Sequence, residues 1–401
     1  MIAFAHSLVC VLRSAQIALG SLDDQDFLRA KRWDLGPVPN WRAYSNNSVI
    51  CSNVEDALSN SDFWGTYEAG EPMGLVNLEA MRTYGRAGDT RYPDPRVEGC
   101  NPCAEQGLAN TEVCCLSELI LPRIQSKAEL LECARLVYIA CKRSLTLPCP
   151  ESAETQAIVR TNMRIGIGIT GYMQATEEQK SWLPECYEYV RAVDEEYSRA
   201  HGLPPSVKLT TVKPSGTLSL LADVTPGCHP AYSQFYIRRV RIAGDSPLLK
   251  LLERHGYGAE PTVRFDGTKD YNTWVVSFPC RVPEGTVLAE QCSAIQQLEV
   301  VRRLQRDWSD NSVSVTVTYR KDELPAIKKW LQEHYELTKS VSFLLYSGHG
   351  FVQAPLEPIS EAEYEALVAR CTPLDTSEAV RNAAADENES LECAGGACPA
   401  K

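Results

Sequence analysis

The sequence has 401 residues and carries a formal net charge of −12. This length can bury a sizeable core in one large or two ordinary domains, and 44% hydrophobic and 23% charged residues are typical of globular proteins. The acidic balance argues against a general nucleic-acid surface, and no apolar run of about eighteen residues predicts a membrane span.

Cysteine usage indicates a reducing compartment. There are 16 cysteines, but several, such as Cys133 and Cys141, lie in helical apolar patterns where a free thiol acts as a small hydrophobic group. A chain of this size needs no disulfide framework, so we expect a cytoplasmic protein. The apolar start over residues 1–20 lacks a basic region and therefore predicts a packed helix and not a secretory signal.

Residues 1–98 are predicted to be a lead-in of helices and loops. Apolar positions that include Leu8, Val11 and Leu19 favour one or two helices over residues 1–35. The stretch 41–49 is crowded with Asn and Ser, which fits either ordinary turn chemistry or a segment that faces a pocket. Residues 70–94 are rich in Gly and Pro and predict a loop.

The stretch Gly99–Glu105 is where we expect the chemistry. Asn101, Cys103 and Glu105 stand at alternate positions, so their side chains can face one substrate. A neighbouring carboxylate and burial both raise the pKa of a thiol and suppress its thiolate. Such a thiol is a poor nucleophile, but it is suited to losing a hydrogen atom.

A glycine-rich motif follows a strand predicted at residues 113–121 and a helix, opened by Ser126, to about residue 145. Gly166, Gly168 and Gly171 match the dinucleotide fingerprint formally, but a helical run to about His201 follows where the second strand of that motif should lie. We therefore predict a buried strand with close backbone packing.

A second informative stretch runs from residue 208 to 219. A predicted strand enters a Pro-Ser-Gly-Thr turn at residues 214–217, which fits either an ordinary helix cap or a nest of amides for an anion. Beyond it, His229 is expected to be a structural or pocket-edge residue and not a metal ligand. Helices and strands alternate from residue 245 to 345, which predicts the α/β class.

Residues 373–401 are predicted to form a flexible tail, because the composition becomes polar and acidic. Cys393 and Cys398 are separated by a Gly-Gly spacer close to the end of the sequence. Two thiols on a mobile arm suit a dithiol shuttle that exchanges with a buried disulfide.

These features together resemble the ribonucleotide reductases. Asn-Pro-Cys-Ala-Glu at residues 101–105 is similar to the Asn-Pro-Cys-Gly-Glu finger loop of that family, and Cys114, the Pro-Ser-Gly-Thr turn and the tail dithiol follow in the family's order. The sequence has no paired tyrosines but has the tail, so it resembles the monomeric, adenosylcobalamin-dependent class II. Ala104 departs from the usual Gly and costs about 1 kcal/mol if φ is positive there.

The resemblance implies a role for each matching residue. Cys103 would become the thiyl radical that removes the 3′-hydrogen of the ribose, with Glu105 as general base, Asn101 as hydrogen-bonding partner and Cys114 as one reducing thiol. Cys393 and Cys398 would restore the reducing thiols. The substrate's phosphates would bind at Ser215, Gly216, Thr217 and Ser219. The implied cofactor is adenosylcobalamin, the substrate a ribonucleoside triphosphate, and the reductant thioredoxin-like.

The fold implied is the second half of a ten-stranded α/β barrel around a central finger loop, over residues 99–372. The family's first half is not in this sequence, so the resemblance also implies a partner chain that carries it. We favour a split enzyme over a decayed remnant, because the catalytic positions that are present are intact.

Two other interpretations fit part of the cysteine pattern. A zinc module could use Cys100, Cys103, Cys114 and Cys115, but adjacent cysteines in a strand point to opposite faces and fit a tetrahedral site poorly. A thioredoxin-type oxidoreductase needs its Cys-x-x-Cys at the start of a helix, and Glu105 does not fit that motif. No other metal site is predicted.

Overall fold

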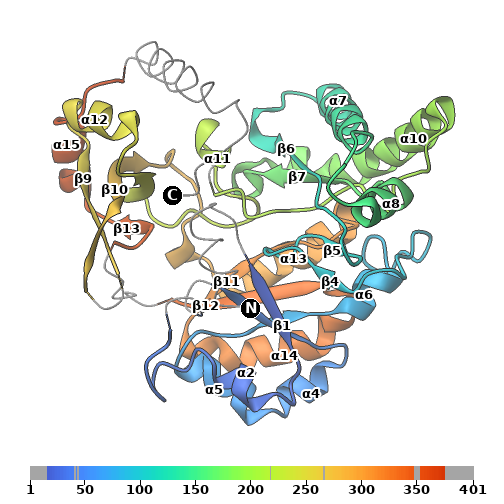
Figure 1. The fold of residues 1–401 in the computed structure, drawn as a ribbon, viewed down its shortest axis with the longest axis horizontal. Helices are drawn as coiled ribbons and strands as arrows, with labels where there is room; N and C mark the ends of the chain where they lie inside the picture. Colours follow the sequence, from blue (N-terminus) through green and yellow to red (C-terminus); the bar gives the residue numbers. More distant parts are fainter. Residues whose placement is uncertain are drawn as a thin grey trace. The chain divides into compact units, whose positions relative to one another are not determined.

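The computed structural model describes residues 16–39, 42, 45–216, 218–264, 267–346 and 353–374. The described residues divide into two compact units, one built from residues 16–231 and 286–346 and the other from residues 232–285 and 353–374 (Figure 1). This division differs from the expected boundaries at residues 98 and 372, because residues 232–285 belong to the second unit and contain a separate apolar core.

A five-stranded sheet lies at the centre of the first unit. Its order is β1 (Ile17–Gly20), β2 (Asn46–Ile50), β3 (Gly74–Val76), β12 (Ser340–Leu345) and β11 (Thr316–Tyr319). Neighbouring strands are parallel except β3 and β12, which are antiparallel.

The hydrogen-bonded series continues beyond β11. Val313 forms a parallel bridge to Val212, and Thr210 forms one to Ile167 of β7 (Gly166–Thr170), which pairs in parallel with β6 (Leu116–Ile120). Within the described chain, the series is therefore β6, β7, residues 208–212, residues 312–319, β12, β3, β2 and β1. Five neighbouring segments run one way and three the other, and this confirms the predicted α/β class.

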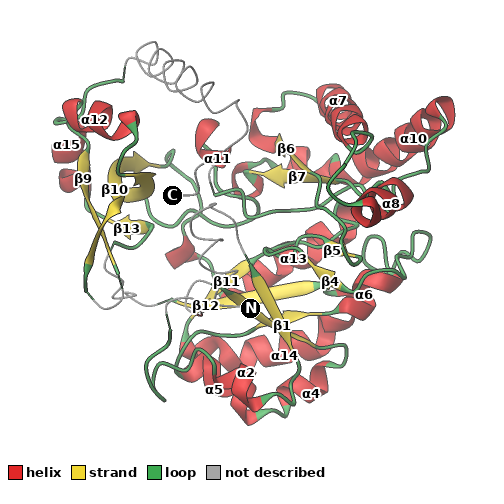
Figure 2. Cartoon of the chain, in the orientation of Figure 1, coloured by secondary structure: helices red, strands yellow, loops and turns green. Residues whose placement is uncertain are grey.

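The helices of the first unit pack around these strands, as Figure 2 shows. Ser126 accepts a hydrogen bond from the Glu129 amide and begins α7, as predicted, and Gly202, at φ 63°, ends α10 after His201. The bounds are α2 (Gln25–Arg29), α4 (Val54–Leu58), α5 (Ser61–Glu68), α6 (Leu78–Thr83), α7 (Lys127–Ser144), α8 (Ala153–Asn162), α9 (Glu177–Ser181), α10 (Leu183–His201), α11 (Leu218–Leu221), α13 (Ala294–Asp307) and α14 (Leu324–His334).

The expectation of a purely helical and looped lead-in is wrong. Ile17–Gly20 forms β1, and β2 and β3 also precede residue 98. The backbone of β1 pairs with that of β2 from Asn46 to Val49, a distant partner that the apolar spacing does not reveal. Within the predicted helical range 1–35, α2 (Gln25–Arg29) is a helix, and residues 1–15 lie outside the described residues.

The second unit is an antiparallel sheet with two helices. Its strands are β13 (Leu356–Pro358), β8 (Phe235–Ala243), β10 (Lys269–Arg281) and β9 (Gly258–Val263), in that order, with α12 (Pro247–Arg254) and α15 (Glu361–Val368). Leu249, Leu252 and Val276 form its apolar centre. Across both units, none of the described helices combines the length and hydropathy required to cross a bilayer.

Candidate functional site

The predicted chemistry lies at the tip of a short hairpin. The strands β4 (Gly99–Cys100) and β5 (Gly107–Leu108) pair in an antiparallel manner and leave residues 101–106 as the tip, which we call the thiol loop. Asn101 closes it: its amide donates to the Gln106 carbonyl at 3.1 Å, and its side-chain oxygen accepts from the Gln106 amide at 3.0 Å. Ala104 has φ 58°, the conformation for which a glycine would be expected.

Burial and charge keep the Cys103 thiol protonated. Cys103 is an exposed residue, but three effects raise the pKa of its thiol to about 11. The largest is partial burial of the thiol, the next is the Glu105 carboxylate, and the third is the Cys114 thiol. Burial, followed by Glu105, likewise raises the pKa of Cys114. The thiols therefore stay in the S–H form at neutral pH, as the sequence predicted.

Glu105 is itself buried, and burial raises its pKa, opposed by a hydrogen bond from Asn101 and by the charge of Lys213. Its Oε2 atom is buried and has no protein partner. Asn101 also influences Cys114 through a hydrogen bond. Asn101, Cys103, Glu105 and Cys114 thus act on one another electrostatically at one place.

Two further charged residues belong to this site and were missed. The Glu118 side chain is fully buried and lies 3.4 Å from Lys213 Nζ, measured to its Oε2. Burial raises the pKa of Glu118, and its Oε1 has no protein partner. The sequence signal for Glu118 is a carboxyl group inside an apolar strand, at an even number of residues after Cys114.

The Pro-Ser-Gly-Thr turn adjoins this pair of charges. Ser215, at φ 45°, donates its hydroxyl to Glu118 Oε2 at 2.5 Å. The buried Ser219 donates its hydroxyl to the Ser215 carbonyl at 2.6 Å, so it braces the turn from inside. Gly216 is exposed. Thr217 and the tail cysteines Cys393 and Cys398 lie outside the described residues.

Cys115 points away from the site, as the alternation of side chains predicted. Its Sγ lies 3.6 Å from Ser144 Oγ and 3.8 Å from the Cys141 carbonyl, both in α7. Among the residues that the structure describes, no three His, Cys, Asp or Glu side chains gather as metal ligands. Cys100, Cys103, Cys114 and Cys115 therefore form no zinc site in the structure.

The remaining motifs have structural roles. All five residues of β7 are buried, and a Cβ on Gly166 would lie 2.7 Å from Leu116 Cδ2, so close packing explains the glycines as expected. His229 Nε2 accepts a hydrogen bond from the Thr316 amide at 3.0 Å, and burial lowers its pKa. His229 is thus a neutral brace at the start of β11.

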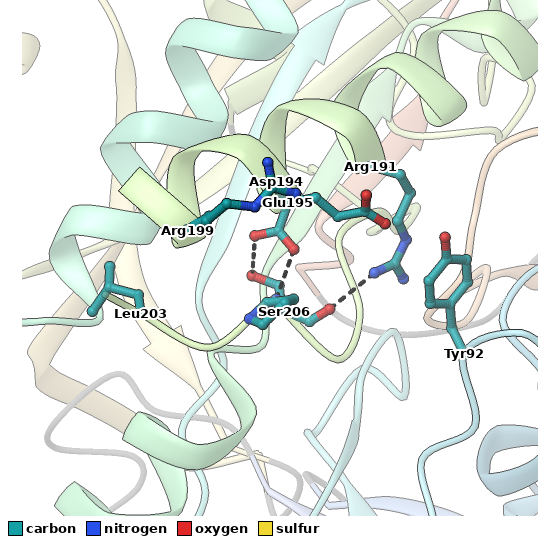
Figure 3. Close-up of a pocket in the computed structure, with 8 residues that line it drawn as sticks. Tyr92, Arg191, Asp194, Glu195, Arg199, Leu203 and Ser206 are labelled. Carbon is teal, nitrogen blue, oxygen red and sulfur yellow. Dashed lines mark hydrogen bonds between the residues drawn. The ribbon is translucent and has the colours of Figure 1, made fainter. Parts of the chain in front are cut away.

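A hollow of about 390 Å³ lies against α10 in the first unit (Figure 3). Its buried charges are already paired, Arg191 with Asp310 and Asp194 with Lys142. Arg191 and Asp194 also hydrogen-bond Ser206. None of the predicted site residues lines it. The lining residues are Tyr92, Arg191, Asp194, Glu195, Arg199, Leu203, Pro205 and Ser206.

Comparison with known proteins gives a consistent result. No family model matches the sequence. The adenosylcobalamin-dependent ribonucleoside-triphosphate reductases of Lactobacillus acidophilus and Lactobacillus leichmannii are 36% and 33% identical to it, each over 98% of this chain and 57% of the relative. The chain is a homologue of the adenosylcobalamin-dependent ribonucleotide reductases.

A solved structure supports the homology. The crystal structure of a B12-dependent class II ribonucleotide reductase matches 90% of this chain and 54% of its own, with a TM-score of 0.74 and 29% identity. The α subunit of a class Id ribonucleotide reductase from Actinobacillus ureae, at 14% identity and a TM-score of 0.57, shares the fold. The chain spans a little over half the length of these curated relatives.

Proposed function

We propose that this reductase homologue carries the radical thiol site for converting ribonucleoside triphosphates to 2′-deoxyribonucleotides. The observation that supports this most directly is the protonated Cys103 thiol, placed beside Asn101, Glu105 and Cys114. Hydrogen-atom transfer needs an S–H bond, and the pKa of about 11 preserves it. Bound adenosylcobalamin would supply the radical that removes this hydrogen, and the exposed, protonated sulfur fits that need.

Each residue then has a chemical task. The Cys103 thiyl takes the hydrogen from C3′ of the ribose, so that the S–H bond re-forms and the radical moves to carbon. Glu105, with a free Oε2 and a raised pKa, accepts and returns protons at the ribose hydroxyls and assists loss of the 2′-hydroxyl as water. Asn101 orients these groups. Cys114 supplies one of the two reducing thiols, and the pair ends as a disulfide.

We propose that the substrate phosphates bind at the turn of Ser215, Gly216, Thr217 and Ser219. The exposed Gly216 leaves an approach to the backbone. The Ser215 hydroxyl would exchange Glu118 for a phosphate oxygen, and Lys213 supplies a compensating positive charge beside the turn.

The proposed partners follow from the fold and from the cycle. In the described chain, β1 and β6 each pair on one edge only, and such open edges invite further strands. We propose that further strands, supplied by a partner chain, complete a ten-stranded barrel around the thiol loop. Residues 99–372 would be the second half of this catalytic assembly. Cys393 and Cys398 would return electrons from a thioredoxin-like protein to the reducing thiols.

The test is reconstitution. The chain is mixed with a candidate complementary chain, adenosylcobalamin, a nucleoside triphosphate and a dithiol, and deoxynucleotide is measured. Cys103→Ser should abolish product, whereas Cys133→Ser, a thiol on α7 outside the site, should retain it. Product formation by folded Cys103→Ser protein would overturn the proposal.

A further inference from the structure

Four consecutive carbonyl groups of the thiol loop, at residues 102–105, accept hydrogen bonds from side chains that are distant in sequence. In the order of the carbonyls, the donors are Asn46 Nδ2 at 2.8 Å, Ser314 Oγ at 2.6 Å, Ser340 Oγ at 3.2 Å and Thr211 Oγ1 at 2.9 Å. We call these four side chains the loop donors. Each of these carbonyl groups in the loop tip is thus hydrogen-bonded to a side chain from a surrounding segment.

The loop donors come from different segments of the sheet series. Asn46 begins β2, Thr211 lies in residues 208–212, Ser314 precedes β11, and Ser340 begins β12. Three of them are buried, and Asn46 is exposed. No local turn chemistry produces this arrangement, because every donor lies at least 56 residues from its acceptor in the chain.

Holding the carbonyl oxygens also fixes the direction of the Cys103 side chain. Each peptide unit is planar, so a fixed oxygen on either side of Cys103 fixes both peptide planes that meet at its Cα. The direction of its Cα–Cβ bond follows from those planes. The same ties hold Ala104 at a φ of 58°, a conformation that a non-glycine residue adopts only under constraint.

We propose that Asn46, Thr211, Ser314 and Ser340 are positioning residues that aim the Cys103 sulfur. They act through the loop backbone, and none of them is assigned a contact with substrate. Hydrogen transfer tolerates little misplacement of the reacting atoms, so the need for aiming rests on the proposed function. The ties themselves do not depend on it.

A purely structural explanation is that the buried hydroxyls only satisfy their own hydrogen-bonding needs. Ser340 illustrates the difference, because its hydroxyl also lies 2.7 Å from Ser312 Oγ and already has a partner apart from the loop. Structural serines affect the stability of the chain, whereas positioning serines also change the environment of one particular thiol. The Cys103 thiol therefore serves as the reporter.

The experiment measures alkylation of the full chain by iodoacetamide, with Cys103 and Cys114 quantified separately by peptide mass spectrometry between pH 7 and 10. Ser314→Ala and Asn46→Ala should release the loop, move the sulfur away from the Glu105 carboxylate and its partly buried surroundings, and so lower its pKa. A fall of one pKa unit raises the thiolate population, and with it the Cys103 rate at pH 8 relative to Cys114, about ten-fold. Ser314→Thr keeps the hydroxyl and should retain the wild-type ratio.

Ser198→Ala is the matched control, because Ser198 is a buried serine on α10 that hydrogen-bonds Asp194 and does not touch the loop. An unchanged ratio in both Ser314→Ala and Asn46→Ala, or an equal rise in Ser198→Ala, would overturn the proposal. Should Ser314→Ala fail to fold by circular dichroism, the exposed Asn46 decides. No step of this test requires catalysis, so its failure is separable from failure of the proposed function.

Discussion

The Cys103 thiol is surrounded by groups that oppose its ionisation. Burial acts first, the Glu105 carboxylate second and the Cys114 thiol third, and only Lys213 acts in the other direction. Because Glu105 acts through its negative charge, neutralising that one side chain should change the thiol without rebuilding the loop. The electrostatics of the site can therefore be tested on single residues.

Glu105→Gln should lower the pKa of Cys103 below its wild-type value of about 11. Removing a nearby negative charge favours the thiolate, so the midpoint of the rate against pH for thiol alkylation should move toward neutral pH. Glu98→Gln, an exposed residue before the hairpin, is the control and should leave the midpoint in place. An unmoved midpoint in Glu105→Gln would show that burial alone raises the pKa.

Glu118→Gln should stabilise the chain at pH 8. The pKa of Glu118 is raised in the folded state, so its protonation contributes stability that is fully present below the unfolded pKa and is lost as pH rises through the folded pKa. Gln imitates the protonated acid. Urea unfolding should therefore show a gain at pH 8 that vanishes near pH 4, and an equal gain at both pH values would contradict the argument.

At the scale of elements, periodic and local signals were reliable. The glycine strand, the Ser126 cap and the long helix ending at His201 follow from residues close in the chain, and the structure has all three. The placement of Asn101, Cys103 and Glu105 close together was likewise predictable, because their alternation within one hairpin tip is local. Their catalytic roles stay a prediction.

The signals that failed depend on contacts between distant segments. Strand β1 exists because β2 pairs with it, and short apolar segments do not distinguish a helix from a strand. Ser314 and Ser340 are ordinary serines in the sequence and acquire a role only where their strands pass beneath the loop. Lys213 lay in a stretch already singled out, but its charge partner Glu118 is on another strand.

Gly166→Ala should destabilise the first unit by about 1 to 3 kcal/mol, because overpacking a filled strand forces neighbours to move. The added methyl would meet Leu116 Cδ2 at 2.7 Å and Gln106 Nε2 at 2.8 Å. Gly258→Ala on β9 is the control, since nothing lies within 4 Å of its added Cβ and its φ is not positive. Equal midpoints of chemical unfolding for the two variants would contradict the packing argument.

At the scale of the whole molecule, buried ion pairs join distant parts of the first unit. Arg164 forms ion pairs with Asp94 at 2.6 Å and with Glu112 at 3.0 Å. Arg191 of α10 pairs with Asp310. All of these side chains are almost fully buried. A buried pair contributes little net stability but makes the loss of one member costly.

Asp310→Asn should cost about 3 to 5 kcal/mol, because it leaves the Arg191 charge buried without a counter-charge. Burial alone would raise the pKa of Asp310, but Arg191, Lys208 and two backbone amides lower it overall. Its contribution is therefore present above the unfolded pKa and is lost as pH falls through the folded pKa. Urea unfolding at pH 7 and at pH 3 should show the penalty shrinking in acid.

Asp62→Asn is the control for this prediction. Asp62 forms a partly exposed pair with Arg29 at 3.1 Å, and an exposed pair contributes less than about 1 kcal/mol. A comparable loss in both variants would mean that burial does not set the cost.

The sequence separations between the loop donors and their acceptors bear on the order in which the chain folds. The separations run from 56 to 236 residues, so the hairpin tip takes its final shape only after strands from both ends of the first unit have docked. Contacts between residues far apart in the chain slow folding, because their loops must close before the contacts can form. We therefore expect the sulfur proposed to initiate radical chemistry to be oriented only after these segments have docked, so that a partly folded chain would carry the thiol without its native orientation.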